Sequence, residues 1–452
     1  MNIIIAGCGK VGTVLAQNLS SENHDVTVID LSEQRLEYAS SALDVMCTAG
    51  NAASYDVLKS VGAAKADLII AMTGEDELNL LICLIAKKMG VKNTIARVRN
   101  PVYYKSIGIL KNDLGISMAI NPEREAASEM FRPLIFKSAN QIETFSKSRT
   151  EILTINVRED SALCDIQIKD LEKAVKAKIL VCAIKRNGEI FIPNGLSYIK
   201  AGDTLSFLAT RDEAQRFFKK IGYDLGRVKN LTIIGGGKIG YYMGRLAISH
   251  GIPVRIIDKD EAVCRDLRLR LPSAEIICGD ATNTSLIEEE NLLASSAVAV
   301  MTSIDETNIL ISMYFTKNAP KCKVITKIKK SDFEDMVFNM DIGSVFNPKY
   351  ITADRILRYV RAIDASGDDE VESITHVINN KVEVLEFAIR PGAPNVGRQI
   401  KKLNFRKNLL LAAIQRRGTT IYPGGTDTIE VGDSVVVVTT EKGVRSYAQI
   451  FR

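Results

Sequence analysis

Short apolar runs, separated by stretches with helical periodicity, dominate the first part of the chain. Residues 3–6, 26–29, 66–73 and 95–98 are almost continuously apolar, and intervening segments such as residues 14–19 have the spacing of a helix. Strands that are apolar on both faces and alternate with helices are typical of a parallel sheet covered by helices on each side. The pattern therefore predicts a doubly wound α/β domain.

The same order of runs returns near residue 230, and a smaller unit follows each copy. Residues 231–234, 254–257, 295–302 and 325–328 repeat the four apolar runs, and both copies place Asp-Glu-x-Asn before a long apolar helix. In the smaller unit, residues 183–188 match residues 413–418 at an offset of 230, and alternating strands surround shared Gly-Asp turns. We expect two large doubly wound α/β domains, each followed by a small α+β domain: residues 1–138, 139–226, 227–366 and 367–452.

Each large unit opens with a glycine-rich turn between its first strand and first helix. In a GxGxxG turn the first glycine permits the bend, the second lets the backbone approach a diphosphate, and the third allows close packing of strand and helix. The helix N-terminus supplies unpaired N–H groups to the anion. Two such turns predict two Rossmann-type nucleotide sites, built from Gly7, Cys8, Gly9, Lys10, Val11 and Gly12 and from Gly235, Gly236, Gly237, Lys238, Ile239 and Gly240.

An acidic residue ends the second strand of each large unit. Asp30 and Asp258 each lie 23 residues beyond the first glycine of their turn. A carboxylate there can bind the adenosine ribose and repel a 2′-phosphate, which favours NAD, NADH or an adenine nucleotide over NADP. Lys259 directly follows Asp258 and weakens that exclusion in the second site.

Later strand ends supply further candidates. Asn51-Ala52 and Asp280-Ala281 follow the third strands, where they would either contact an adenine ring or cap the next helix. The remaining candidates end the fourth and fifth strands, near the expected nicotinamide half or terminal phosphates, and are Thr73, Gly74, Arg97, Thr302 and Lys327. The two cations could neutralise phosphates or form an interdomain ion pair, and the sequence leaves both open.

Each large unit closes with Asn-Pro, at residues 121–122 and 347–348. Proline suits the first turn of a helix, and apolar residues at helical spacing follow both pairs. These segments predict either an ordinary packing helix or a crossover or dimer helix.

The composition is that of an ordinary soluble protein. Of 452 residues, 46% are hydrophobic and 25% are charged, the net charge is +5, and no apolar run could span a bilayer. The chain enters its first strand at once, so no signal peptide is expected. Single scattered cysteines, including Cys8, Cys47, Cys182 and Cys278, predict small core residues in a reducing compartment. Neither nucleic-acid binding nor a metal site is expected, because basic blocks and metal-ligand spacing are missing.

The paired GxGxxG turns, the Gly-Asn-Ala and Gly-Asp-Ala turns, the Asn-Pro helices and the Ile-x-Arg-x-Gly motif of the small units together resemble the RCK, or potassium-conductance-regulating, family over essentially the whole chain. The resemblance implies RCK-N and RCK-C domains alternating twice, binding of NAD or NADH with ATP or ADP as competitors, and a homo-oligomer, with a tetramer as the expected form. It also implies a cytoplasmic regulatory subunit, peripheral on the inner face of the membrane, that gates a Trk-type (TrkH-like) potassium transporter. The two copies differ at two candidate positions: Asn51 of the first corresponds to Asp280 of the second, and Arg97 of the first corresponds to Lys327 of the second. The two sites could therefore prefer different nucleotides.

Two other functions remain open at this stage. An NAD-dependent oxidoreductase would need a proton relay, yet His24 and His250 precede the second strands, His376 lies in a strand pattern of the second small unit, and no catalytic residue is predicted. A pure assembly module with decayed clefts is opposed by the two intact glycine turns.

Overall fold

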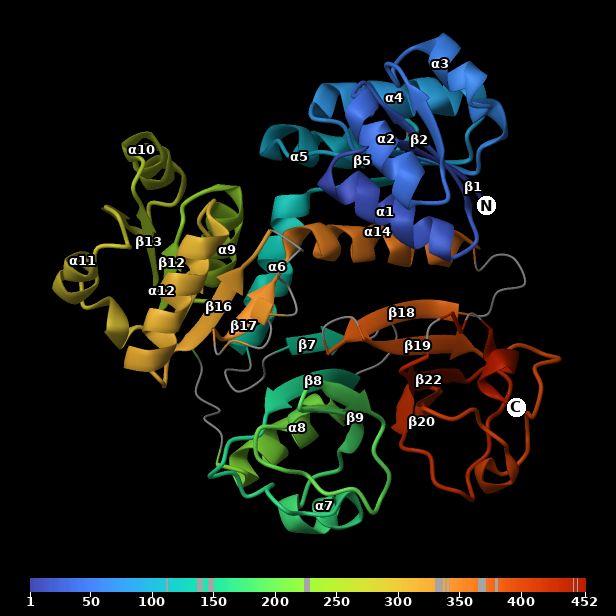
Figure 1. Ribbon diagram of the computed structural model, residues 1–452, viewed down its shortest axis with the longest axis vertical. Coiled ribbons are helices and arrows are strands. Elements are labelled where there is room, and N and C mark those ends of the chain that lie inside the picture. The colour runs from blue at the N-terminus through green and yellow to red at the C-terminus, as the bar shows by residue number, and fades with distance from the viewer. Residues whose placement is uncertain are drawn as a thin grey trace. The chain divides into compact units, whose positions relative to one another are not determined.

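The structure is a computed structural model that describes residues 1–110, 113–135, 141–144, 150–222, 228–329, 336–337, 340, 342–364, 371–378, 381–441, 443–444 and 446–452. It contains two parallel six-stranded sheets and two antiparallel five-stranded sheets (Figure 1). The predicted class, two doubly wound domains with two small α+β domains, is confirmed. The expected domain boundaries fall largely on residues outside the described ranges.

The first parallel sheet has the strand order β3-β2-β1-β4-β5-β6, which is the order of a dinucleotide-binding fold. Its strands are β1 (Asn2–Ala6), β2 (Asp25–Asp30), β3 (Met46–Ala49), β4 (Leu68–Ala71), β5 (Asn93–Arg97) and β6 (Met118–Ile120). The crossover helices are α1 (Lys10–Ser21), α2 (Glu33–Ala42), α3 (Tyr55–Ser60), α4 (Asp76–Met89) and α5 (Pro101–Leu110). The central strands β1 and β4 are buried on both faces, which explains their continuous apolar sequence.

The second parallel sheet repeats this order as β14-β13-β12-β15-β16-β17. Its strands are β12 (Leu231–Ile234), β13 (Val254–Asp258), β14 (Glu275–Cys278), β15 (Ala297–Val300), β16 (Lys323–Lys327) and β17 (Ser344–Phe346). The helices of this domain include α9 (Lys238–Ser249), α10 (Glu261–Arg270), α11 (Thr284–Glu289) and α12 (Asp305–Asn318). In both domains the sheet order reverses between the first and fourth strands, at the edge where each glycine turn lies.

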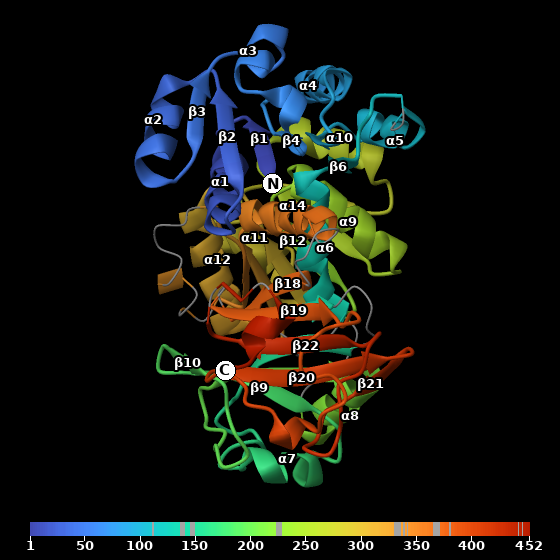
Figure 2. The ribbon, with the colours of Figure 1, turned by 90° about the vertical axis from the view of Figure 1, so that its right-hand side faces the viewer.

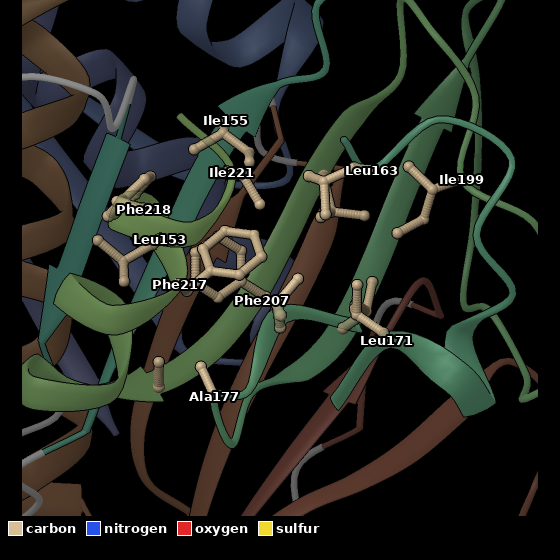
Figure 3. Packing of buried hydrophobic residues seen from close by; sticks show 14 of the residues in the cluster. Leu153, Ile155, Leu163, Leu171, Ala177, Ile199, Phe207, Phe217, Phe218 and Ile221 are labelled. Carbon is tan, nitrogen blue, oxygen red and sulfur yellow. The ribbon is translucent and has the colours of Figure 1, made fainter. Parts of the chain in front are cut away.

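The first antiparallel sheet belongs to the first small domain. Its strands are β7 (Gln141–Thr144), β8 (Thr150–Asn156), β9 (Leu180–Arg186), β10 (Glu189–Phe191) and β11 (Thr204–Thr210), accompanied by α7 (Ile168–Val175) and α8 (Arg211–Lys220). Phe207 of β11 packs against Phe217 of α8 (Figure 3), and their ring centroids are 4.7 Å apart. These rings are fully buried, so they fix α8 on one face of the sheet.

The second antiparallel sheet contains β18 (Val371–Val377), β19 (Val382–Ala388), β20 (Leu409–Arg416), β21 (Thr419–Ile421) and β22 (Ser434–Thr439), with short helical turns at η3 (Ile400–Lys402) and η4 (Tyr447–Ile450). The two antiparallel sheets lie next to each other in Figures 1 and 2. They share one apolar core, to which Ile152 and Leu208 contribute from the first sheet and Val384 and Val436 from the second. The small domains therefore pair within one chain.

In each small domain the Gly-Asp turn holds a buried ion pair. Asp203 accepts hydrogen bonds from Arg186 Nε at 2.8 Å and Nη2 at 2.7 Å, and Asp433 accepts from the same two atoms of Arg416 at 2.8 Å. The aspartate side chains are only 1% exposed. These motifs were predicted to be turns, and the structure adds a paired charge to that role.

The two Asn-Pro helices start at the prolines, as α6 (Pro122–Ile135) and α14 (Pro348–Asp364). The chain divides into two compact units, and each of these helices runs from one into the other: the first unit holds Met1–Glu129 and Asn347–Leu357, and the second holds Met130–Phe346 and Arg358–Arg452. Within the second unit, Phe131 of α6 packs on the His250 ring at the end of α9, with centroids 5.0 Å apart. Each helix thus has residues in both units, as expected for a crossover helix, and the dimer role stays a prediction.

Two candidate nucleotide-binding sites

The first glycine turn owes its shape to two glycines that no other residue could replace without strain. Gly7 has φ +110°, and a Cβ there would lie 2.8 Å from the carbonyl oxygen of Met72. A Cβ on Gly12 would overlap the carbonyl oxygen of Gly7. Gly9, in contrast, has open space where its Cβ would be and begins α1 without a side-chain cap. The turn is therefore closed toward the sheet and open at the helix N-terminus.

The second turn has the same geometry. Gly235 has φ +109°, a Cβ there would lie 2.9 Å from the Met301 carbonyl group, and Gly237 faces open space. One position differs between the sites: a Cβ on Gly236 would meet Leu267 of α10 at 2.6 Å, whereas the first site has the buried residue Cys8 there. The side chains of Lys10 and Lys238 are exposed, and Val11 and Ile239 are half-buried.

Both strand-end acids lie against their glycine turns. Asp30 Oδ2 accepts a hydrogen bond from the backbone N–H of Cys8 at 2.6 Å, and Asp258 Oδ2 accepts from Gly236 N–H at 2.7 Å. Their Oδ1 atoms accept from the N–H groups of Ser32 at 2.8 Å and Asp260 at 2.9 Å. A carboxylate oxygen has two lone pairs, so each can still accept a ribose hydroxyl. Both acids thus lie beside the turn, where a ribose acceptor is needed.

Asn51 and Asp280 order the loops after the third strands rather than cap the next helices. Asn51 Oδ1 accepts from Ala53 N–H at 2.9 Å, and Asp280 Oδ1 accepts from Thr282 N–H at 2.9 Å. The Thr282 hydroxyl also donates to Asp280 Oδ1, at 2.8 Å, and the two bonds from Thr282 hold the pKa of Asp280 below its ordinary value. The N-cap residues of α3 and α11 are instead Ser54 and Asn283. Ala52 and Ala281 are buried beneath these loops, and the predicted adenine contact stays a prediction.

The fourth and fifth strand ends are joined by a buried asparagine that the sequence analysis did not single out. Asn79, fully buried at the start of α4, accepts from Thr73 N–H at 2.8 Å and from Thr73 Oγ1 at 2.7 Å, and it donates to the Arg97 carbonyl oxygen at 3.0 Å. Asn308 makes the same bonds to Thr302 and to the Lys327 carbonyl oxygen. The signal was the repeated Asp-Glu-x-Asn, interpreted only as a helix start. Gly74 is exposed between β4 and α4.

The aspartate of the same motif holds the loop after the fifth strand. Asp76 Oδ2 accepts from the N–H groups of Arg99 at 2.8 Å and Asn100 at 2.7 Å, and Asp305 Oδ2 accepts from Lys329 N–H at 2.9 Å. Each carboxylate is almost completely buried. The Asp-Glu-x-Asn motif therefore positions the ends of the fourth and fifth strands. In the sheet order these strands lie on one side of the glycine turn, and the strand that ends in Asp30 or Asp258 lies on the other.

The two strand-end cations differ in their surroundings. Lys327 Nζ donates to the Met301 carbonyl oxygen at 2.6 Å, and burial lowers its pKa to about 8. Burial is also the main cause that lowers the pKa of Arg97, yet its Nε and Nη2 atoms have no hydrogen-bond partner among the described residues. Within that part of the chain, neither cation forms an ion pair, so the interdomain pair left open by the sequence is not observed.

The histidines lie away from these strand ends. His24 is in the turn before β2, with Nδ1 3.3 Å from the N-terminal amino group, and His250 ends α9 before β13. Both precede a strand, whereas the glycine turns follow one. His376 lies within β18. Two of the four cysteines expected in the core depart from the prediction: Cys278 is exposed because it ends the edge strand β14, and Cys47 is half-buried on the other edge strand β3.

The sites fit a bound nucleotide diphosphate. Each combines a glycine turn that is open at a helix N-terminus, a carboxylate tied to that turn, and a cation at the fifth strand, and the first keeps two unsatisfied guanidinium atoms. Among the described residues no cluster of potential metal ligands occurs. The fold and the sites together define a protein with two Rossmann-type nucleotide-binding domains, each followed by a small paired α+β domain.

Comparison with known proteins gives the family. The TrkA-N domain matches residues 3–122 and 231–348, and the TrkA-C domain matches residues 152–222 and 384–452. The chain therefore belongs to the RCK family, as a protein with tandem TrkA-N and TrkA-C domains, in agreement with the resemblance predicted from its motifs.

Individual relatives match along the whole chain. It is 32% identical over 452 residues to the Trk system potassium uptake protein TrkA homolog of Archaeoglobus fulgidus, covering 100% of both chains. It is 26% identical to the Trk system potassium uptake protein TrkA of Haemophilus influenzae, covering 98% of this chain and 96% of that one.

Solved structures share the fold. The GsuK channel bound to NAD superposes with a TM-score of 0.61 at 17% identity, over 99% of this chain and 77% of that one. GsuK bound to ADP gives a TM-score of 0.51 at 17% identity, over 81% and 70%. Among the described helices of the present chain, none has the length and apolar character needed to cross a bilayer.

Proposed function

We propose that this chain is the regulatory subunit of a Trk-type potassium uptake system, and that NAD, NADH or an adenine nucleotide controls it through both of its TrkA-N domains. The observation that carries the proposal is the pair of glycine turns, each of which donates a backbone hydrogen bond to a strand-end carboxylate. The names of the relatives support the transport system, and the NAD- and ADP-bound GsuK structures support the ligand class.

The residues divide the work of binding along the ligand. The turn N–H groups and the N-termini of α1 and α9 hold the diphosphate, with Gly9 and Gly237 allowing close approach. Asp30 and Asp258 accept the ribose hydroxyls and, since they are anionic, repel a 2′-phosphate. Adenine lies against the loops at Ala52 and Ala281, and the rest of the ligand extends over Thr73 or Thr302 and the fifth strand.

Regulation then requires unequal affinity for two conformations of the protein. Helices α6 and α14 each have residues in both compact units, and we propose that a change at one nucleotide domain is transmitted along them. A difference of about 1–3 kcal/mol between the two conformations gives roughly a 5- to 150-fold effect on the transporter. We propose that the four domains expected at 1–138, 139–226, 227–366 and 367–452 are the moving parts, in a homo-oligomer on the cytoplasmic side of a TrkH-like partner.

We propose no catalytic role. Hydride transfer needs a group that takes or gives a proton near the reacting carbon. His24 and His250 precede their strands, at the opposite edge of the sheet from the glycine turns. NADH consumption with small carbonyl substrates would support the oxidoreductase alternative.

Potassium flux into vesicles that contain a Trk-type transporter tests the proposal. Added protein should make the flux depend on NADH or ATP, and Asp30→Ala together with Asp258→Ala should remove that dependence. Asp25→Ala is a matched control, because Asp25 is exposed at the opposite end of the same strand as Asp30. A potassium flux that does not change when the protein and its nucleotides are added would refute the proposal.

A further inference from the structure

Two cysteines of the second nucleotide domain meet where its second and third strands end. Cys264, fully buried on α10, donates its thiol to the Asp258 carbonyl oxygen at 3.3 Å. Cys278 ends β14, and its Cα atom is paired in register with that of Asp258. The next N–H group, of Gly279, donates to the same Asp258 carbonyl oxygen at 2.9 Å. One backbone oxygen therefore holds both cysteine segments together.

The two thiols are in contact with each other. Cys264 Sγ also lies 3.9 Å from the carbonyl oxygen of Ile277, the residue before Cys278. Burial is the main cause that raises the pKa of Cys264 to about 11, and a hydrogen bond with the Cys278 thiol is the next cause. Cys278 is exposed, so a small reagent can reach this thiol from solvent. An accessible sulfur beside a buried one is the arrangement of an attacking and a resolving thiol.

Helix α10 connects these thiols to the second glycine turn. Val263 directly precedes Cys264, and Leu267 lies about one helical turn after it. Leu267 is 2.6 Å and Val263 3.1 Å from the position that a Cβ on Gly236 would take. Asp258, whose carbonyl oxygen binds the Cys264 thiol, also accepts the Gly236 N–H group on its Oδ2 atom at 2.7 Å. A displacement of α10 or of the end of β13 therefore acts directly on this turn.

The first nucleotide domain lacks thiols at both corresponding positions. They are taken by Leu36, buried on α2, and by Ala49, which ends β3 and is paired in register with Asp30. Burial raises the pKa of the Cys8 and Cys47 thiols of this domain, so neither competes as a fast-reacting group. The first site therefore serves as an internal control for oxidation of the second.

We propose that Cys264 and Cys278 form a thiol–disulfide modification site that controls the second nucleotide site. The oxidant is a low-molecular-weight disulfide. The Cys278 thiolate attacks one sulfur of this reagent, releases one small thiolate and leaves a mixed disulfide. Cys264 then attacks the Cys278 sulfur, more slowly because it is buried, and its proton goes to the second small thiolate that leaves. Two protein thiols are thus oxidised to one disulfide, and the reagent is reduced to two small thiols.

The new bond weakens nucleotide binding at the second site. It brings the two sulfurs to about 2 Å, closer than a hydrogen-bonded pair of thiols, so α10 moves toward the end of β14. It also removes the proton that Cys264 donates to the Asp258 carbonyl oxygen. Because Leu267 packs closely beside Gly236, the turn that receives the diphosphate changes shape with the helix. This consequence rests on the proposed nucleotide-regulated function, whereas formation of the disulfide does not.

Peptide mapping and calorimetry of the full chain test the two steps. Hydroxyethyl disulfide should join Cys264 to Cys278 in a peptide identified by mass spectrometry, and dithiothreitol should reverse the reaction. In the Asp30→Ala protein, where the second site remains, oxidation should weaken NADH or ATP, whichever binds more tightly, by at least ~5-fold. In the Asp258→Ala protein, the same treatment should leave the affinity of the first site unchanged.

Cysteine variants separate the disulfide from other effects of the oxidant. Cys278→Ser, at an exposed position, should prevent the bond and make the nucleotide affinity insensitive to oxidation. Cys264→Ser should stop at the mixed disulfide on Cys278, which mass spectrometry detects as an adduct. Cys164→Ser, at a half-buried position of the first small domain, is the matched control and should respond like the unmodified chain.

Three results would overturn the inference: no bond between these cysteines, a bond that leaves the affinity unchanged, or an effect of the oxidant that persists in Cys278→Ser. If the reduced, unmodified chain binds no nucleotide, the proposed function fails and the inference fails with it. If that chain binds nucleotide and oxidation does not change its affinity, only the inference fails.

Discussion

Replacing Gly9 by alanine should weaken nucleotide binding at the first site by about 100-fold or more while the domain stays folded. No atom lies within 4 Å of the Cβ that the substitution adds, and the residue has φ −80°, which alanine adopts freely. The methyl group would occupy the space through which a diphosphate approaches the turn. The fold can therefore accommodate the methyl group, but a bound diphosphate would clash with it.

The expected magnitudes follow from this geometry. Alanine is a poorer N-cap than glycine by about 0.5–1 kcal/mol, which lowers the melting temperature by about 2–4 °C for a domain of this size. Loss of two hydrogen bonds to a charged diphosphate, at about 1.5–3 kcal/mol each, weakens binding by about 100-fold or more.

Gly12→Ala provides the contrast, because here the added Cβ overlaps the Gly7 carbonyl oxygen. Overpacking costs about 1–3 kcal/mol, and the better helix propensity of alanine offsets about 1 kcal/mol of it. The backbone of the turn must also move. Gly12→Ala should therefore lower the melting temperature and weaken binding together.

Thermal melting and calorimetry, both in the Asp258→Ala background, compare the two variants. A Gly9→Ala protein that binds nucleotide as tightly as its parent would refute the reasoning, since it would mean that no ligand approaches the open side of the turn. Unfolding of Gly9→Ala would be equally damaging, because the structure leaves room for the methyl group.

Three further predictions concern charge and burial. Burial lowers the pKa of Lys327 to about 8 and that of Lys323 to about 7, so the unfolded chain binds these protons more tightly than the folded chain and stability against urea should rise from pH 8 to pH 10. Lys327 should contribute about 2 kcal/mol of this rise, and Lys327→Met should reduce the rise by that amount without removing the part that belongs to Lys323. Asp203→Asn breaks the buried bidentate pair with Arg186 and should lower the free energy of unfolding by about 3 kcal/mol in the same assay. Asp266→Asn removes the exposed partner of Arg270 and should lower it by less than about 0.5 kcal/mol. Equal losses would contradict the account. Burial raises the pKa of Cys264 to about 11 while Cys278 is exposed, so Cys278→Ser should remove one fast-reacting thiol from a titration with a disulfide reagent and Cys264→Ser should not.

The repeated pattern predicted most of the fold, because both sheets are built from strands buried on two faces. Such strands leave continuous apolar runs, and β1, β4, β12 and β15 all have them. The glycine turns were equally visible, since backbone geometry and packing require glycine at Gly7 and Gly12. The crossover of α6 and α14 between units was not decided by the sequence, because helical spacing gives an apolar face but not the domain that it covers.

The parts of the sites that the sequence did not predict depend on contacts between distant residues. Asn79 has its role only because the ends of β4 and β5 meet around it. In the sequence, Arg97 and Lys327 differ only as one cation in place of another, and this does not reveal the difference in their hydrogen bonds. It arises because the lysine reaches a backbone carbonyl oxygen, whereas two of the arginine donors have no such partner among the described residues.

The number of nucleotides bound per chain tests the central claim most directly. Calorimetric titration with NADH and ATP should find two sites in the unmodified protein, one in either Asp30→Ala or Asp258→Ala, and none when both substitutions are combined. No binding below about millimolar nucleotide, or two sites that survive both substitutions, would contradict the account.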